Sequence, residues 1–281
     1  MIEIDHVNYT YPAPNRVQAL KNVCLNIEAG EFVALIGQNG SGKTTLAKCI
    51  SGFLKPTEGA VRIDGVDTRR MRTSELAQKV GYVFQNPDHQ LFKETVYEEI
   101  VFGLKNIGMP RDRIGKKVEE VLNRMHLWEF RDMHPFRLGK GQRQRVAISA
   151  ILAMEPEILV IDEPTTGQDR KEARAIMDLA LEQNEEGVTV LVITHAMNLV
   201  AEYARRTVAL CEGQVLIEGE TREVFGKVDL LSHTFVQPPQ ITLLGERLGF
   251  NPPVLSVREA EMNILKHLGK MSSPDRRLDP R

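Results

Sequence analysis

One short segment constrains the fold of this chain more than any other, the glycine-rich stretch Gly37–Thr45 (Gly-Gln-Asn-Gly-Ser-Gly-Lys-Thr-Thr). It follows the apolar run Phe32–Ile36 and precedes a helical pattern at Leu46, Ala47 and Ile50. A buried strand, a glycine-rich loop and a helix in direct succession are typical of the phosphate-binding unit of nucleotide-binding α/β domains. The segment therefore predicts an α/β fold built around a phosphate-binding loop.

The residue types in the loop fit the chemistry of a nucleotide. Glycines at 37, 40 and 42 tolerate positive φ and let the backbone approach phosphate oxygens, while successive N–H groups and the helix dipole offset negative charge. Lys43 is expected to reach the β and γ phosphates of ATP, and the Thr44 hydroxyl to hold Mg²⁺. A glycine turn without a ligand is the alternative, and the flanking strand and helix disfavour it. The predicted nucleotide contacts in the loop are Gly37, Gln38, Asn39, Gly40, Ser41, Gly42, Lys43, Thr44 and Thr45.

A second motif is an apolar strand, Ile158–Ile161, that ends in Asp162 and Glu163. We expect Asp162 to meet the metal ion held by Thr44. Glu163 leaves the strand in another direction and is expected to polarise the attacking water as a general base. By itself, a strand ending in two acids is more typical of a solvated strand end. Its combination with the glycine-rich loop favours the catalytic interpretation.

Composition excludes several other classes of protein. Lys and Arg number 36 against 38 for Asp and Glu, so the net charge of -2 shows no basic excess, and we expect no nucleic-acid partner. The start of the chain lacks the apolar segment of a secretory signal, and the most apolar stretch, Val188–Ala201, is too polar to span a membrane. Cys24, Cys49 and Cys211 form no CxxC pair and are expected to be buried in a reducing compartment. A cytoplasmic chain whose membrane role comes through a partner is expected.

Strands and helices alternate along most of the sequence, and Gly187 is expected to end a helix whose apolar face begins at Ala173. Between about 86 and 155 the pattern is almost wholly helical. The predicted fold class is α/β: a P-loop NTPase core with a mixed, mainly parallel sheet and antiparallel N-terminal strands, an inserted helical subdomain and a small C-terminal helical extension. The expected strands cover 2–9, 23–27, 32–36, 61–63, 80–84, 158–161, 188–193, 208–210 and 215–217.

The composition shifts after about Phe235, where two Pro-Pro pairs appear. Ser256 and Glu259 have capping-box spacing before a further amphipathic helix, whose apolar face needs a partner in this chain or in another copy. The expected divisions are an ATPase domain over 1–234, with its helical subdomain at about 86–155, an extension over 235–269 and a flexible tail over 270–281.

Taken together, these segments resemble the nucleotide-binding subunit of ABC transporters over about residues 2–225. The resemblance implies that Gln85 touches the metal ion and the attacking water. It also implies that residues 166–169 form the D-loop, with Asp169 at its end. Tyr11 corresponds to the aromatic residue that stacks on adenine. His195 corresponds to the family's switch histidine, a catalytic role, although a lone histidine after a strand is more often structural.

A narrower resemblance comes from Phe84–Phe92 and Thr95–Glu99, which look like the ATPases of energy-coupling-factor (ECF) importers. Those take up vitamins or transition-metal ions such as cobalt and nickel. The resemblance implies an ATP-hydrolysing subunit on the cytoplasmic face of the membrane, with a transmembrane coupling subunit and a substrate-binding membrane subunit as partners. Residues 85–92 would then line the groove that receives coupling helices. The alternative is that Leu91 and Phe92 simply pack the helical subdomain; both can be true, and we favour the coupling role. A soluble ABC ATPase without transport is the alternative function.

The family signature, usually Leu-Ser-Gly-Gly-Gln, aligns here with Leu138, Gly139, Lys140, Gly141 and Gln142. In the family two subunits face head to tail, and each signature closes the other subunit's ATP site. Gly139 lacks the serine hydroxyl and Lys140 adds a charge. Either Lys140 compensates within a homodimer, or the chain pairs with a different ATPase and the two sites are unequal. We favour unequal partners, because losing a hydroxyl to charged phosphate costs on the order of 1–3 kcal/mol.

Overall fold

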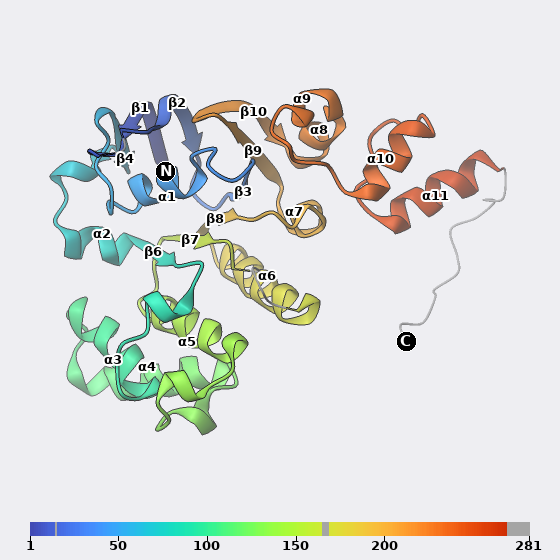
Figure 1. Ribbon diagram of the computed structural model, residues 1–281. Coiled ribbons are helices and arrows are strands. Elements are labelled where there is room, and N and C mark those ends of the chain that lie inside the picture. Colours follow the sequence, from blue (N-terminus) through green and yellow to red (C-terminus); the bar gives the residue numbers. More distant parts are fainter. Residues whose placement is uncertain (15, 165–168, 269–281) are drawn as a thin grey trace.

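The computed structural model describes residues 1–14, 16–164 and 169–268 (Figure 1). The first three residues of the expected D-loop, 166–168, and the expected tail at 270–281 lie outside the described residues. Two β-sheets form the centre of the molecule. The smaller sheet is antiparallel with the order β2-β1-β4-β5 and contains β1 (Ile2–Thr10), β2 (Gln18–Ile27), β4 (Glu58–Ile63) and β5 (Val66–Asp67).

The larger sheet has the order β10-β9-β3-β8-β7-β6 and is parallel except for β10, which pairs antiparallel with β9. Every residue of β3, β7 and β8 is buried, as expected for parallel strands covered on both faces. The glycine-rich loop leaves the carboxyl end of the central strand β3. The strands of the larger sheet are β3 (Phe32–Ile36), β6 (Val80–Val83), β7 (Ile158–Asp162), β8 (Thr189–Ile193), β9 (Arg206–Cys211) and β10 (Gln214–Glu220).

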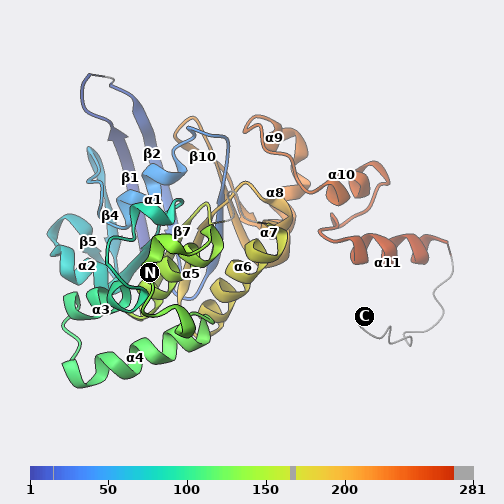
Figure 2. The ribbon, with the colours of Figure 1, turned by 60° about the horizontal axis from the view of Figure 1, so that its bottom comes forward.

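Helices cover the larger sheet, and other helices form a group between β6 and β7 and a C-terminal extension. Between β6 and β7 the longer elements are α3, α4 and α5, which lie together to one side of the sheets (Figures 1 and 2). This arrangement supports the proposed helical subdomain. The helices are α1 (Lys43–Ile50), α2 (Thr73–Lys79), α3 (Val96–Asn106), α4 (Arg111–Arg124), α5 (Lys140–Leu152), α6 (Arg170–Glu185), α7 (Met197–Tyr203), α8 (Thr221–Gly226), α9 (Val228–Ser232), α10 (Gln240–Arg247) and α11 (Val257–His267).

The predicted fold class is confirmed, with one refinement at the N-terminus. The first strands do not join the larger sheet, because β1 pairs with β2 on one side and β4 on the other. Apolar side chains from the small sheet, from α1 and from one face of the large sheet pack into a common core. Helices α3–α7 pack on the opposite face. Gly187 has φ 98 just after α6 ends, as expected of a left-handed helix cap.

The C-terminal helices α10 and α11 stand out from the sheets (Figure 2). The Ser256 hydroxyl accepts the Glu259 N–H at 3.2 Å, as the capping-box spacing predicts. The Glu259 carboxylate instead accepts the Leu255 N–H at 2.9 Å and pairs with Arg222 on α8 at 2.7 Å. Only Ala260 of α11 is buried.

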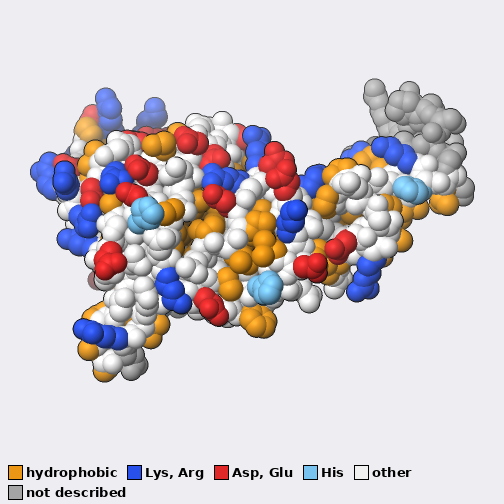
Figure 3. Space-filling view, turned by 90° about the horizontal axis from the view of Figure 1, so that it is seen from above, with side chains coloured by type: hydrophobic (Ala, Val, Ile, Leu, Met, Phe, Trp, Pro, Cys, Tyr) orange, Lys and Arg blue, Asp and Glu red, His pale blue; other side chains and the backbone are white. Residues whose placement is uncertain are grey.

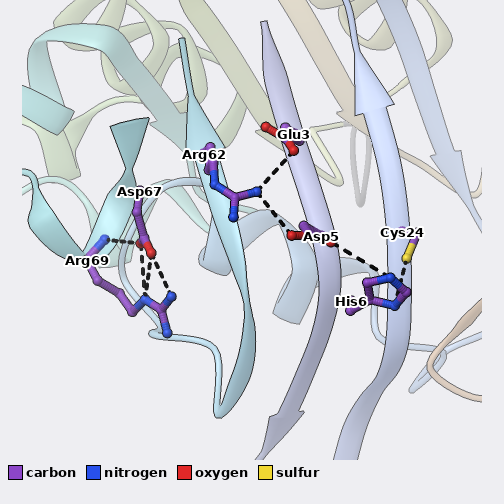
Figure 4. Close-up of polar contacts among 7 residues, drawn as sticks. All are labelled: Glu3, Asp5, His6, Cys24, Arg62, Asp67 and Arg69. Atoms are coloured by element: carbon purple, nitrogen blue, oxygen red, sulfur yellow. Dashed lines mark hydrogen bonds and ion pairs between the residues drawn. The ribbon is translucent and has the colours of Figure 1, made fainter. Parts of the chain in front are cut away.

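Two sequence expectations about the surface have clear outcomes. The cysteines were expected to be buried, and this is confirmed for Cys49, whereas Cys211 is half-buried. The expectation is wrong for Cys24, which is exposed because it occupies an outward position of β2. Its Sγ lies 3.4 Å from Nδ1 of His6, beside the pair that Arg62 forms with Glu3 (Figure 4). Among the described helices none is long and apolar enough to cross a membrane. Acidic and basic side chains are interspersed on the face shown in Figure 3.

Candidate functional site

The glycine-rich loop connects β3 to α1, and its three glycines have the positive φ values expected from the sequence. Gly37, Gly40 and Gly42 have φ values of 143, 81 and 105, and Gly42 is the N-cap of α1. Gly37 also allows a close approach, because a Cβ there would lie 2.3 Å from the carbonyl oxygen of Leu210 on β9. The path of the loop therefore depends on glycine at position 37.

Lys43 lies under this loop and is almost fully buried. Its Nζ donates to the carbonyl oxygens of Gly37 at 2.9 Å and Gln38 at 2.8 Å. Burial lowers the pKa of the ammonium group, and the nearby carboxylates of Glu163 and Asp162 oppose that change. The ammonium group is thus held against the loop, where a bound anion would offset the energetic cost of burying its charge.

A pocket of about 380 Å³ opens beside the loop. The buried Ser41 hydroxyl has no hydrogen-bond partner among the described residues, so the loop holds a polar atom that a ligand would satisfy. Lining the pocket are Tyr11, Val17, Gln18, Ala19, Lys21, Asn39, Gly40, Gly42, Lys43, Thr44, Thr45, Glu163, Glu212 and Gly213. The size and the donors suit the phosphate end of a nucleotide.

Asp162 and Thr44 meet directly at the carboxyl end of β7. The Thr44 hydroxyl donates to Oδ1 of Asp162 at 3.2 Å, and the Tyr82 hydroxyl donates to Oδ2 at 2.7 Å. Burial raises the pKa of the Asp162 carboxyl group, while both hydrogen bonds lower it. A hydroxyl and a carboxylate are oxygen ligands of the kind that Mg²⁺ accepts.

The donor set also shows how such an ion would be held. In the part of the chain that the structure describes, no group of three or more His, Cys, Asp or Glu side chains is arranged to hold a metal ion. Mg²⁺ in nucleotide sites is commonly bound by one or two protein ligands together with substrate phosphates and water. Thr44 and Asp162 fit this arrangement.

Glu163 lies at the centre of a second set of contacts. Its Oε2 accepts from Nε2 of Gln85 at 2.8 Å, and its Oε1 lies 3.1 Å from Nε2 of His195. Its backbone has φ 45, and its N–H donates to the Ile193 carbonyl of β8 at 2.9 Å. The three residues expected to be catalytic therefore come together from the ends of three parallel strands, and Glu163 also lines the pocket.

Tyr11 is one of the residues that line the pocket. Its hydroxyl is 3.1 Å from Oγ1 of Thr45, and its ring packs edge-on against Tyr9 with centroids 4.9 Å apart. The expected stacking on adenine is untested and stays a proposal.

The signature residues lie at the start of α5, and none of them lines this pocket. Leu138 is buried, and the Gly139 N–H donates to Oε1 of Gln142 at 3.0 Å. At Gly141 an added Cβ would meet the Glu172 carboxylate, at 2.1 Å from Oε1. The first turn of α5 thus contacts the first turn of α6.

Asp169, the described end of the D-loop, is the N-cap of α6. Its Oδ1 accepts the N–H groups of Lys171 and Glu172, each at 2.8 Å. Asp169 therefore caps the helix whose Glu172 lies against Gly141.

Two contributors to the site were missed by the sequence analysis. Tyr82 reads as an ordinary core residue of a strand, and only the pairing of β6 with β7 brings it to Asp162. Gly213, in the turn between β9 and β10, donates its N–H to the Ser41 carbonyl at 3.0 Å and lines the pocket.

Comparison with known proteins adds independent evidence. A family model described as "ABC transporter" matches residues 20–166. A putative ABC transporter ATP-binding protein of Caldanaerobacter subterraneus subsp. tengcongensis is 43% identical over 259 residues, with 92% of this chain and 45% of that protein covered. The chain spans less than half the length of this relative and of two similar proteins from Methanosarcina species.

Other relatives match over nearly their whole length. The energy-coupling factor transporter ATP-binding protein EcfA of Methanothermobacter thermautotrophicus is 40% identical over 275 residues, covering 96% of this chain and 88% of that protein.

Two solved structures have a similar fold. CbiO1 of Clostridium perfringens, described as part of the ABC transporter complex CbiONQ, aligns with a TM-score of 0.73 and 33% identity, over 89% of this chain and 98% of that one. A dimeric ATP-binding cassette in a post-hydrolysis state with ADP and Pi aligns with a TM-score of 0.72 and 36% identity, over 79% and 99%.

Proposed function

The chain belongs to the ABC transporter family of ATP-binding proteins, and on that premise we propose that it binds and hydrolyses ATP to energise an ECF-type importer. The relatives named EcfA and EcfA2 and the fold shared with CbiO1 support this transporter class. No observation favours a soluble ABC ATPase without transport. The imported solute is expected to be a vitamin or a transition-metal ion, bound by a separate membrane subunit.

The observation that carries the proposal is the position of Glu163. It lines the pocket of the phosphate loop while Gln85 and His195 hold its two oxygens from opposite sides. We propose that the Glu163 carboxylate accepts a proton from water as the water oxygen bonds to the γ-phosphorus and the bond to ADP breaks. Positioning and electrostatics carry most of such a reaction, and Gln85 and His195 orient the base.

The remaining roles are assigned to the residues around the loop. The backbone N–H groups of 37–45 and Lys43 would bind the phosphates. Mg²⁺ supplies charge neutralisation for the phosphates when bound, and Thr44, Asp162 and Gln85 would hold it. Tyr11 would contact adenine.

A second ATPase subunit is proposed as the first partner. The signature residues 138–142 are absent from this chain's own pocket, which supports their serving an ATP site in trans. The dimeric state of the similar cassette supports a dimer as well. Because Gly139 lacks a hydroxyl, we propose that the other subunit is a different ATPase with a complementary signature.

A membrane subunit is proposed as the second partner, which places the chain at the cytoplasmic face of the membrane. Leu91 is buried in the helical core, whereas Phe92 is 60% exposed and packs edge-on against Phe102, with centroids 4.9 Å apart. The ammonium of Lys93 lies 4.8 Å and 4.3 Å from the centroids of these rings. An exposed aromatic pair, with Phe92 in the segment that follows Gln85 and Phe102 on α3, supports docking of a coupling helix.

ATP turnover measured against chain concentration tests this proposal. With Mg²⁺, we expect turnover per chain to be low for the purified chain alone, and to rise when a second ATPase and the membrane subunit are co-expressed and co-purified. Second-order dependence with near-normal turnover for the chain alone would refute unequal partners. Absence of ATP turnover even in the purified complex would refute the ATPase assignment.

A further inference from the structure

Tyr82 is a buried neighbour of the Asp162 carboxylate that the proposed reaction does not use. It lies on β6 opposite Val160 of β7, and Asp162 is two residues further along β7. Because side chains alternate along a strand, Tyr82 and Asp162 project from the same face of the sheet. Both are 4% exposed, and the Tyr82 hydroxyl donates to Oδ2 of Asp162 at 2.7 Å.

The two oxygens of Asp162 are held by two different donors. Thr44 occupies Oδ1 at 3.2 Å and Tyr82 occupies Oδ2. A carboxylate oxygen has two acceptor directions, so each atom can accept a second contact beside the donor that the described residues give it. Because one donor comes from the loop helix and the other from the neighbouring strand, the plane of the carboxylate is fixed.

The phenol ring is itself held by packing. Its centroid lies 5.3 Å from that of Phe53 and 4.9 Å from that of Phe84, with interplanar angles of 89° and 62°. Phe84 directly precedes Gln85. The direction of the Tyr82 hydroxyl is therefore set by neighbouring rings and not by solvent.

We propose that Tyr82 is a positioning residue for metal binding, whose hydroxyl holds the Asp162 carboxylate in the orientation that receives the Mg²⁺ of bound ATP. The inference rests on the proposed function. Residues that hydrogen-bond to metal ligands orient them, and their loss typically weakens metal affinity about 10- to 100-fold. Thr44 alone would leave Oδ2 of a buried carboxylate without its donor.

A Tyr82→Phe variant tests the hydroxyl while keeping the ring. The readout is the affinity for Mn²⁺, followed by electron paramagnetic resonance in the presence of a non-hydrolysable ATP analogue. Binding of the same analogue in EDTA provides a metal-free measurement. We expect Mn²⁺ affinity to fall about 10-fold and metal-free nucleotide affinity to stay unchanged.

Tyr203→Phe is the matched control. The Tyr203 hydroxyl donates to Oδ1 of Asp178 at 2.5 Å, linking α7 to α6 without lining the nucleotide pocket. Its removal takes away another tyrosine–aspartate hydrogen bond and is expected to leave Mn²⁺ affinity unchanged.

Unchanged Mn²⁺ affinity in Tyr82→Phe would overturn the inference. An equal loss in Tyr203→Phe would also overturn it, because the effect would then reflect general loosening of the fold. If the wild-type chain bound neither the analogue nor Mn²⁺, the proposed function itself would fail.

Discussion

At the scale of single residues, the site depends most closely on the backbone of the phosphate loop. Gly37 has φ 143, and its Cα lies against the carbonyl oxygen of Leu210 on β9, where an added Cβ would be only 2.3 Å from that oxygen.

The requirement for glycine at position 37 leads to a direct stability prediction. Gly37→Ala would combine a φ of 143 with a Cβ that lies 2.3 Å from the carbonyl oxygen of Leu210. That oxygen belongs to the backbone of β9, so relieving the clash would distort the strand. We expect a loss of about 2–5 kcal/mol in the free energy of unfolding, together with loss of nucleotide binding.

Gly108→Ala is the matched control for this prediction. Gly108 has φ 79 with open space around the added Cβ, so only the backbone cost of about 1–2 kcal/mol is expected. Denaturant unfolding of both variants measures the difference. Equal losses of stability in the two variants would show that the approach of Gly37 to β9 is unimportant.

The phosphate loop and the acidic pair could be predicted from sequence because the spacing of their residues is local. Gly37 has the positive φ expected of a loop glycine, and Glu163 lines the pocket beside the loop. The hydrogen bond from Tyr82 to Asp162 could not be predicted, because it depends on which strands are neighbours and in what register.

At the scale of elements, strands with continuous apolar runs were predicted best. The expected strand over 32–36 agrees with β3, whereas β2 begins at Gln18, five residues earlier than expected. Its first half is polar at Gln18 and Lys21 and is held by pairing with β1. The contact of α11 with α8 could not be predicted either, because the Arg222–Glu259 pair joins residues that lie 37 positions apart in the sequence.

The Arg222–Glu259 pair leads to a prediction about α11. The two terminal guanidinium nitrogens of Arg222 donate to the carboxylate, at 2.7 and 2.9 Å, and this hydrogen bonding lowers the pKa of Glu259. Because the folded pKa is lowered, this contribution is complete above the unfolded value of about 4.3 and is lost as pH falls through the folded value. The pair is about one-third exposed, so its contribution is at most about 1 kcal/mol.

Limited proteolysis at neutral pH measures this contact. We expect Arg222→Ala to be cleaved near α11 up to about fivefold faster than the wild type. Arg258→Ala, at an exposed position on α11 itself, serves as the control and is expected to be cleaved like the wild type. Identical cleavage of both variants would show that the pair does not hold α11.

At the scale of the whole molecule, the class of fold was predictable because alternating strands and helices surround one phosphate loop. The separation into two sheets was not, since it depends on β1 pairing on both edges. The molecule presents the loop and Glu163 in one pocket and the signature residues elsewhere, on α5. This separation is why the proposal assigns the other half of each ATP site to a second subunit.

The claim that Glu163 is the base of an ATPase is tested most directly by Glu163→Gln. In the assembly in which the wild type turns over ATP, we expect the variant to bind ATP normally, to retain it in a closed dimer and to hydrolyse it at least about 100-fold more slowly. Glu129→Gln, at an exposed position in the helical part, is the control and should match the wild type. Unaltered turnover in Glu163→Gln would contradict the account.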